Sequence, residues 1–369
     1  MLGFPAVDPI PLPAPVWLFK LLHVVTLSLH FVAVQMMLGG LLVAILLNFF
    51  ARKGNAATAA QALGRRLPVL MTYVINLGVP PLLFAQVLYG RALYTSSVLI
   101  GAWWISIILL LTIAYWLLYR FSAALNKGMS AWWIGGIAWL LIGLIARILS
   151  SNMTLMLRPE VWQQMYSSST VGKYLPTCDP TLVPRWLFMM AGGLVFSGLW
   201  MIFLSSRQAF EADAKRFLSR TGGLIALVGA PVQVAVGFWV YNTQPAVVQE
   251  SLNSHLLYAL SGKVWLALLA LIFVIGLIAA LLKTASPILS WSAVLVGTLA
   301  SIAHTNYRDG LRDFTLLSKG YDVWARTIVT NWSVVILFLV LFVAGLGVIG
   351  WLLSVVARAT QVTEKAAQP

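Results

Sequence analysis

Two histidines lie seven residues apart in an otherwise apolar run near the N-terminus. In the stretch HVVTLSLH, His23 and His30 are nearly two helical turns apart, so both rings fall on one face, roughly 10 Å apart along the axis. An ionisable side chain is costly in hydrocarbon and therefore indicates a functional site. Neutral imidazole is a common ligand of metal ions and of haem iron. Because the spacing is too wide for both rings to bind one iron, the pair predicts either two haems or one haem and one structural hydrogen bond.

The other two histidines, His255 and His304, lie where apolar runs begin and end. We expect all four at or near the outer leaflet, where they could supply axial ligands to the iron of one or more haem b groups. Other interpretations stay open for three of the four histidines. His255 fits an interfacial position at a helix end, His23 could hydrogen-bond between helices, and His304 precedes a polar stretch.

Arg147 is the one cation expected deep inside a helix, in the run LLIGLIARILSSNM. A cation at that depth needs a partner or a wet cavity. Arginine can pair with a carboxylate through two parallel hydrogen bonds, so a haem propionate would suit it. The alternative is that its long side chain extends to the outer head groups.

The composition places these residues in a membrane. The chain has 60% hydrophobic and only 9% charged residues, with a mean hydropathy of +0.90, whereas an ordinary soluble domain is about a quarter charged. The net charge of +14 does not indicate nucleic-acid binding, because the Lys and Arg residues collect in loops beside apolar segments, without a dense basic run. We therefore predict no nucleic-acid partner and a multi-pass protein in contact with the lipid bilayer.

The apolar runs predict an all-α bundle of about nine transmembrane helices in one membrane domain, residues 1–369. Residues 1–15 form a Pro-rich outer segment, and residues 358–369 a cytoplasmic tail. The stretch TNYRDGLRD after His304 is predicted to be a polar outer loop. The expected helices cover 16–50, 67–90, 96–121, 131–157, 182–205, 219–241, 257–282, 286–306 and 329–357.

The distribution of basic residues predicts an outer N-terminus and an inner C-terminus, because short cytoplasmic loops carry the excess of Lys and Arg. We expect the location to be the bacterial cytoplasmic (inner) membrane. The only cysteine, Cys178, excludes an internal disulfide and the CxxCH motif of c-type haem attachment. The basic residues expected on the inner side are Arg52, Lys53, Arg65, Arg66, Arg120, Lys127, Arg207, Lys215, Arg216, Arg220, Lys283, Arg358 and Lys365.

The order of several motifs resembles subunit I of the cytochrome bd-type quinol oxidases. VTLSLHFVAVQMMLGG places His30 on the haem-ligating histidine of that family's first helix. NLGVPPLLFAQVLYG is similar to its NFG-to-QFG stretch, ARILSSNMTLMLRPEVW to its ANGWMQ-P segment, and YNTQPAVVQESL to its QP stretch. In IAHTNYRDGLRDFTLLS, His304 stands near the family's glutamate haem ligand, and Arg308 near the arginine of its GRQPW motif. The resemblance implies the family's nine-helix fold, haem b cofactors and a second membrane subunit.

Two departures from the family pattern limit that resemblance. The histidine of the family's fifth helix aligns near Leu187, where only Met189 or Met190 could replace it as a ligand. The acidic residues of its third helix have no counterpart in GAWWISIILLLTIAYWLLY. His23 has no equivalent in the family.

We therefore expect a haem b electron-transfer subunit of a bd-like respiratory oxidoreductase. It would pass electrons between the membrane quinol pool and an outer-face c-type cytochrome or other redox subunit. Three alternatives remain: a haem-free structural subunit that anchors its partners, a true O₂-reducing oxidase subunit, and a small-molecule transporter. Apart from Gln35, Asn76, Gln86 and Arg147, the interior at mid-membrane is expected to be nearly bare of polar residues, which disfavours the transporter.

Overall fold

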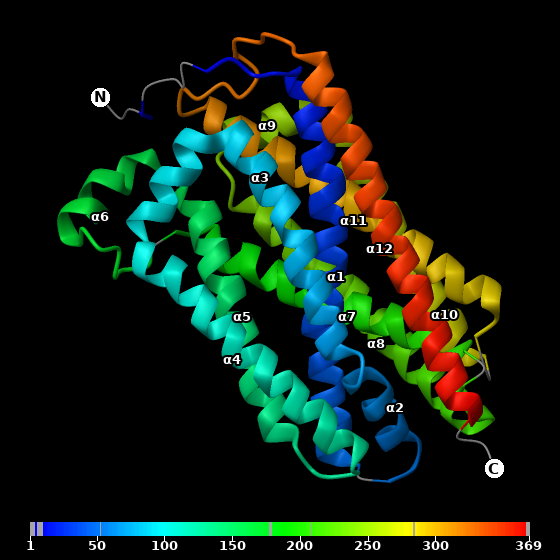
Figure 1. The fold of residues 1–369 in the computed structure, drawn as a ribbon. Helices are drawn as coiled ribbons and strands as arrows, with labels where there is room; N and C mark the ends of the chain where they lie inside the picture. The colour runs from blue at the N-terminus through cyan, green and yellow to red at the C-terminus, as the bar shows by residue number, and fades with distance from the viewer. Residues whose placement is uncertain are drawn as a thin grey trace.

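The apolar runs form long α-helices that lie side by side (Figure 1). The computed structural model describes residues 4–5, 10–51, 53–176, 179–207, 209–282 and 285–366, so Arg52, Cys178 and Lys283 lie outside the described residues. Over these ranges, nine candidate spans are long and apolar enough to cross a membrane. The helices of these spans are α1 (Val16–Phe50), α3 (Leu67–Leu99), α4 (Gly101–Asn126), α5 (Trp132–Leu155), α7 (Leu182–Ser205), α8 (Ala212–Asn242), α10 (Leu256–Leu281), α11 (Pro287–Leu317) and α12 (Trp332–Ala366).

Shorter helices lie in the connections between the spans. They are α2 (Gly54–Gly64), which leads into α3, the 3₁₀ turn η1 (Pro159–Val161), α6 (Trp162–Ser168) and α9 (Ala246–Ser254). The described strand pairing is limited to a bridge between Leu12 and Ile328. The predicted all-α membrane bundle is therefore confirmed, whereas the side of the membrane on which each terminus lies stays a prediction.

Helix α11 differs most from its predicted bounds. It continues eleven residues beyond the expected end at 306, up to Leu317, so the prediction of a loop at TNYRDGLRD was wrong. Its start follows local sequence rules, because the hydroxyl of Ser286 accepts a hydrogen bond from Leu289 N at 3.1 Å and Pro287 occupies the first turn. Helix α3 also continues past its predicted end at 90, but its backbone is kinked at Tyr89, with φ −122° and ψ 17°.

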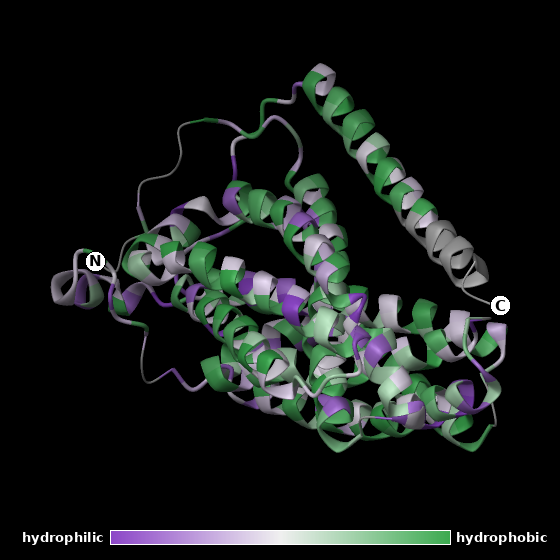
Figure 2. Ribbon diagram, turned by 60° about the horizontal axis from the view of Figure 1, so that its bottom comes forward, coloured by the Kyte–Doolittle hydropathy of each residue, from purple (hydrophilic) through white to green (hydrophobic). Residues whose placement is uncertain are grey.

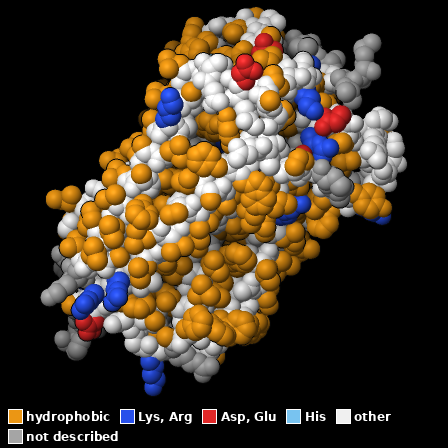
Figure 3. Space-filling model, turned by 180° about the vertical axis from the view of Figure 1, so that it is seen from behind, with side chains coloured by type: hydrophobic (Ala, Val, Ile, Leu, Met, Phe, Trp, Pro, Cys, Tyr) orange, Lys and Arg blue, Asp and Glu red, His pale blue; other side chains and the backbone are white. Residues whose placement is uncertain are grey.

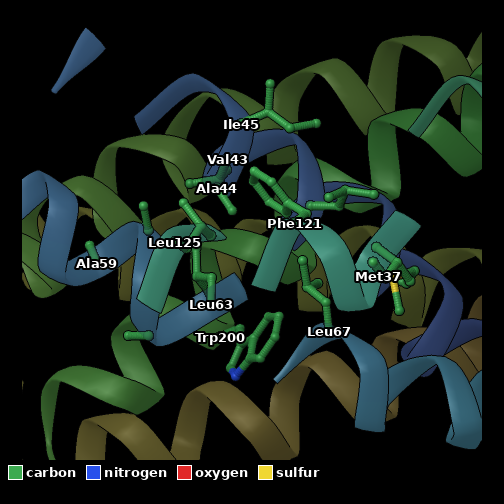
Figure 4. Packing of buried hydrophobic residues seen from close by; sticks show 14 of the residues in the cluster. Met37, Val43, Ala44, Ile45, Ala59, Leu63, Leu67, Phe121, Leu125 and Trp200 are labelled. Atoms are coloured by element: carbon green, nitrogen blue, oxygen red, sulfur yellow. The ribbon is translucent and has the colours of Figure 1, made fainter. Parts of the chain in front are cut away.

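Helix α1 runs through the middle of the bundle and contacts α3, α5, α7 and α11. Its closest approach is to α7, where a Cβ added to Gly39 would lie 1.7 Å from the carbonyl oxygen of Gly193. Only a residue without a side chain allows the two backbones to come so near. Two residues before Gly39, Met37 packs with Leu63, Phe121 and other buried side chains in one apolar cluster (Figure 4).

The outside of the bundle is mostly apolar, as expected for a surface that faces lipid (Figures 2 and 3). Helix α12 is the most exposed of the spans. Its first half contacts the other helices, where Phe338 lies edge-on to Phe84 with 6.1 Å between the ring centroids. Just before α12, the backbone at Thr327 and Val329 hydrogen-bonds to Leu12, which fastens the described part of the Pro-rich segment.

Candidate functional site

A buried ionic cluster lies at the end of the bundle where α1 begins and α11 ends. Lys20 of α1 donates hydrogen bonds to the hydroxyl of Tyr89 (2.7 Å), to Asp309 Oδ2 (2.9 Å) and to both oxygens of Asp313. The Tyr89 hydroxyl in turn donates to Asp309 Oδ1 at 2.8 Å. Tyr89 is fully buried at the kink of α3. The kink therefore delivers a hydroxyl to two carboxylates that lie one turn apart on α11.

His23 belongs to the same cluster, and both of its ring nitrogens are engaged. Its Nδ1 lies 3.0 Å from the carbonyl oxygen of Pro81, and its Nε2 lies 3.1 Å from Nη1 of Arg312. Because the guanidinium can only donate, Nε2 accepts and Nδ1 carries the proton. Arg312 also lies 3.7 Å from Asp309 Oδ1 and above the ring of Tyr89. His23 therefore links α1, α3 and α11 through protein contacts.

Sequence reasoning missed most of this cluster, and the expectation of a nearly bare interior was wrong. Lys20, Tyr89 and both aspartates were not considered as site residues, because the second half of α11 was taken for a loop. The signal was present in the spacing. Asp309 and Asp313 are four residues apart, as are Arg308 and Arg312, and this is the period of one helical face.

His30 lies deeper in the bundle than His23 and has a different environment. Its Nδ1 is 3.1 Å from the carbonyl oxygen of Val74 on α3, and its Nε2 forms no hydrogen bond with any described residue. Gly78 on α3 faces the ring, since a Cβ there would lie 2.9 Å from His30 Cε1. An imidazole with one nitrogen held by a backbone carbonyl and the other unengaged has the arrangement typical of a metal ligand.

His304 of α11, like His30, lies beside the ring of Phe31. The Phe31 ring centroid is 6.1 Å from that of His30 and 5.9 Å from that of His304. The His304 ring also stacks on Phe188 at 4.6 Å, and its nitrogens form no hydrogen bond within the described part of the chain. The structure therefore brings His30 and His304 close to one aromatic ring, as candidate ligands on α1 and α11.

Positive charge exceeds negative charge in the region of His304 and the buried ionic cluster. Arg308 lies over the Phe31 ring at 5.5 Å and forms no ion pair with the described residues. Arg185 of α7 bonds to Gln244 Oε1 at 3.1 Å, and its Nε is buried without a partner. Arg185, Arg308 and Arg312 are close enough to repel one another. The cations of this region are Lys20, Arg185, Arg308 and Arg312, against the three buried carboxylates of Asp179, Asp309 and Asp313.

The remaining predicted site residues lie apart from the two candidate ligands. His255 is exposed between α9 and α10, where it stacks on Tyr258 with 4.5 Å between centroids. Arg147 donates to Ser151 Oγ at 2.6 Å within its own helix α5. Met189 and Met190 are partly buried on α7, and Met190 packs against the apolar cluster around Met37.

The donor set fits a haem, although the packing around it is closed. Two imidazoles with unengaged nitrogens could bind iron, and Arg308 and Arg185 could hold two propionates, although Arg185 already donates to Gln244. The cavity beside His304 measures only about 10 Å³. A macrocycle bound to His304 therefore requires aromatic rings such as Phe31 and Phe188 to turn aside. No group of three or more His, Cys, Asp or Glu side chains suited to a bare metal ion occurs in the described ranges.

A second, more exposed ionic group joins the connections at the same end of the bundle. Glu160 of η1 accepts hydrogen bonds from Lys319 (2.9 Å) and Arg158 (3.1 Å). Partial burial would raise the pKa of this carboxyl, but the hydrogen bonds from Lys319, from its own backbone and from Arg158 outweigh burial and hold the pKa below its usual value. Glu160 is therefore charged at neutral pH and ties the η1 turn to the residues after α11.

Fold and composition together define a multi-pass helical membrane protein. Its fold is similar to that of a solved structure described as bd oxidase from Geobacillus thermodenitrificans, with a TM-score of 0.62 and 12% sequence identity. The similarity covers 98% of this chain and 100% of that chain. No protein-family model matches the sequence, and no curated protein matches it. The expected bd-like fold is therefore supported at a distance, and the resemblance to subunit I in particular stays a prediction.

Proposed function

We propose that this chain is a haem b-binding electron-transfer subunit of a bd-like respiratory complex in the bacterial inner membrane. His30 is the best candidate for an axial ligand, and His304 is the second. Bound haem would supply one-electron transfer. Arg308 and Arg185 would pair with its propionates, and the aromatic rings around His304 would exclude water from the iron. Electrons would pass between the quinol pool and an outer-face redox partner such as a c-type cytochrome, with a second membrane subunit beside this chain.

The environment of His30 is the observation that carries the proposal. Its Nδ1 is held by the Val74 carbonyl, which fixes the tautomer and aims Nε2 away from α3. His23 has the same residue type on the same helix, but Arg312 and Pro81 occupy both of its nitrogens. The two histidines thus have different surroundings, and of the two only His30 has a nitrogen left for iron.

The test is haem quantification by the pyridine haemochrome method, together with a reduced-minus-oxidised spectrum of the purified full chain. We expect b-type bands. His30→Ala should remove at least one haem, whereas the matched control His255→Ala, at an exposed position, should retain the full content. A preparation that contains no haem after expression with haem supplementation would contradict the proposal.

A second candidate, a haem-free structural subunit, is favoured by the close packing beside His304. The cavity there leaves room for about one water molecule. This alternative predicts that His30→Ala and His304→Ala change neither the spectrum nor the assembly of partner subunits. Co-purification of those subunits with the variants would then assign an anchoring role.

A further inference from the structure

A small polar cavity lies in the middle of the bundle, between helices from both halves of the chain. Gln35 of α1, Gln233 of α8, and Ser301 and His304 of α11 supply its polar lining. The space for a water-sized molecule is about 10 Å³, which is close to the minimum that one water needs. The rest of the lining is apolar and includes Trp265.

Three polar side chains around this cavity have no protein partner. Gln233 is 3% exposed, and its Oε1 is buried without a hydrogen bond. Gln35 is 2% exposed, and neither its amide nor the His304 ring hydrogen-bonds to any residue that the structure describes. Ser301 differs, because its hydroxyl donates to the carbonyl oxygen of Ser28 at 3.0 Å. Burying a polar group without a hydrogen bond costs about 1–3 kcal/mol, so the buried Oε1 of Gln233 calls for a polar occupant.

A glycine on α7 leaves space for the amides of Gln35 and Gln233. A Cβ added to Gly192 would lie 2.3 Å from Nε2 of Gln35 and 3.0 Å from Nε2 of Gln233. Both glutamines therefore rest against the bare backbone of α7 at the same position. The side chains of Gln35 on α1 and Gln233 on α8 thus converge on one glycine, while Ser301 and His304 border the cavity from α11.

We propose that this cavity binds one ordered water molecule, which donates to Gln233 Oε1 and hydrogen-bonds to the Gln35 amide and the His304 ring. An internal water typically makes two to four such bonds, and these groups supply three. An apolar occupant would leave every one of them unsatisfied. The water gives the buried imidazole of His304 a hydrogen-bond partner. The proposal does not depend on haem.

The first test is a cryo-electron microscopy map of the full chain in lipid nanodiscs, at a resolution that shows ordered waters. We expect density within hydrogen-bond distance of Gln233 Oε1 in the wild type. Gln233→Met, which keeps the length of the side chain but removes the amide, should lose that density. Ser301→Ala should retain it, because the Ser301 hydroxyl is already engaged. Absence of density beside a well-defined Gln233, or density that persists in Gln233→Met, would overturn the proposal.

Thermal unfolding is a second test, in which a water-filled cavity and a dry cavity predict opposite changes of the melting temperature. If water fills the cavity, Gln233→Met lowers the melting temperature, since the water loses one of its hydrogen-bond partners. If the cavity is dry, the same variant raises the melting temperature, because an unsatisfied amide is removed. Gln35→Met tests the same prediction at the cavity residue of α1. Haem content of the same preparations tests the proposed function separately, since neither the density nor the melting shift requires haem.

Discussion

The imidazole of His23 faces the guanidinium of Arg312, with 3.1 Å between Nε2 and Nη1. This contact joins residues that are 289 positions apart and belongs to a cluster that also holds Lys20, Asp309 and Asp313. Charged groups at this depth are stable only as a set, because each has lost its hydration. The stability of the bundle should therefore depend strongly on every member of the cluster.

Lys20→Met should destabilise the protein by about 3–5 kcal/mol, because it leaves the carboxylates of Asp309 and Asp313 buried without their main cation. The measurement is thermal or denaturant unfolding in detergent. Lys319→Met is the control, since the ion pair of Lys319 with Glu160 is partly exposed and should be worth about 1 kcal/mol or less. Equal effects of the two substitutions would contradict the predicted difference in burial.

Arg308→Gln should lower the midpoint potential of a haem that His30 or His304 would hold. Removing a nearby positive charge favours the oxidised iron, and a shift of about 59 mV in a one-electron couple corresponds to ~1.4 kcal/mol. Potentiometric titration of the b-type bands measures this shift. Arg147→Gln tests the other arginine that the sequence suggested. Because Arg147 already bonds to Ser151, we expect a smaller change there, and a larger one would transfer the propionate role to Arg147.

Gly39→Ala should disrupt the crossing of α1 and α7, since its Cβ would lie 1.7 Å from the carbonyl oxygen of Gly193. Backbone cannot move aside as a flexible side chain can, so the helices must separate. We expect a loss of at least the ~1–3 kcal/mol typical of overpacking, measured by thermal unfolding. Gly136→Ala is the matched control within a helix, because nothing lies within 4 Å of its added Cβ, and it should unfold like the wild type.

The stability that Glu160 contributes should depend on acidic pH. Its pKa is lowered in the folded protein from the ordinary 4.5, so its contribution is fully present above that value and disappears as the pH falls through the lowered pKa. The difference in melting temperature between the wild type and Glu160→Gln should therefore shrink below about pH 4.5. A difference that stays constant down to pH 2 would show that the charge of Glu160 does not stabilise this connection.

Much of the fold was predictable from local sequence. The bounds of α1 and α7 agree with the apolar runs, and Pro287 begins α11 as expected. The failure at Asp309 and Asp313 has a physical reason. A polar stretch at the end of an apolar run looks like a loop unless its charges are neutralised inside the protein, and the neutralising cation, Lys20, lies 289 residues away from Asp309.

The candidate site was predictable in part. The depth of His30 and His304 follows from their places in apolar helices, and the structure places both beside Phe31. The resemblance already separated His30 from His23, but their partners could not be predicted, because these are Arg312 and backbone carbonyls of α3. Periodicity identifies the face of a helix, but it does not identify the partner that meets that face.

The pairing of Lys20 with α11 also has a consequence for biosynthesis. Helix α1 is synthesised long before α11. Lys20 therefore enters the membrane before its partners Asp309 and Asp313 have been made. During that interval, the amino group has to reach the head groups or recruit water. Nascent chains truncated before α11 should therefore be recognised by membrane quality control. Stable packing of α1 against α11 would begin only after the two aspartates have been synthesised.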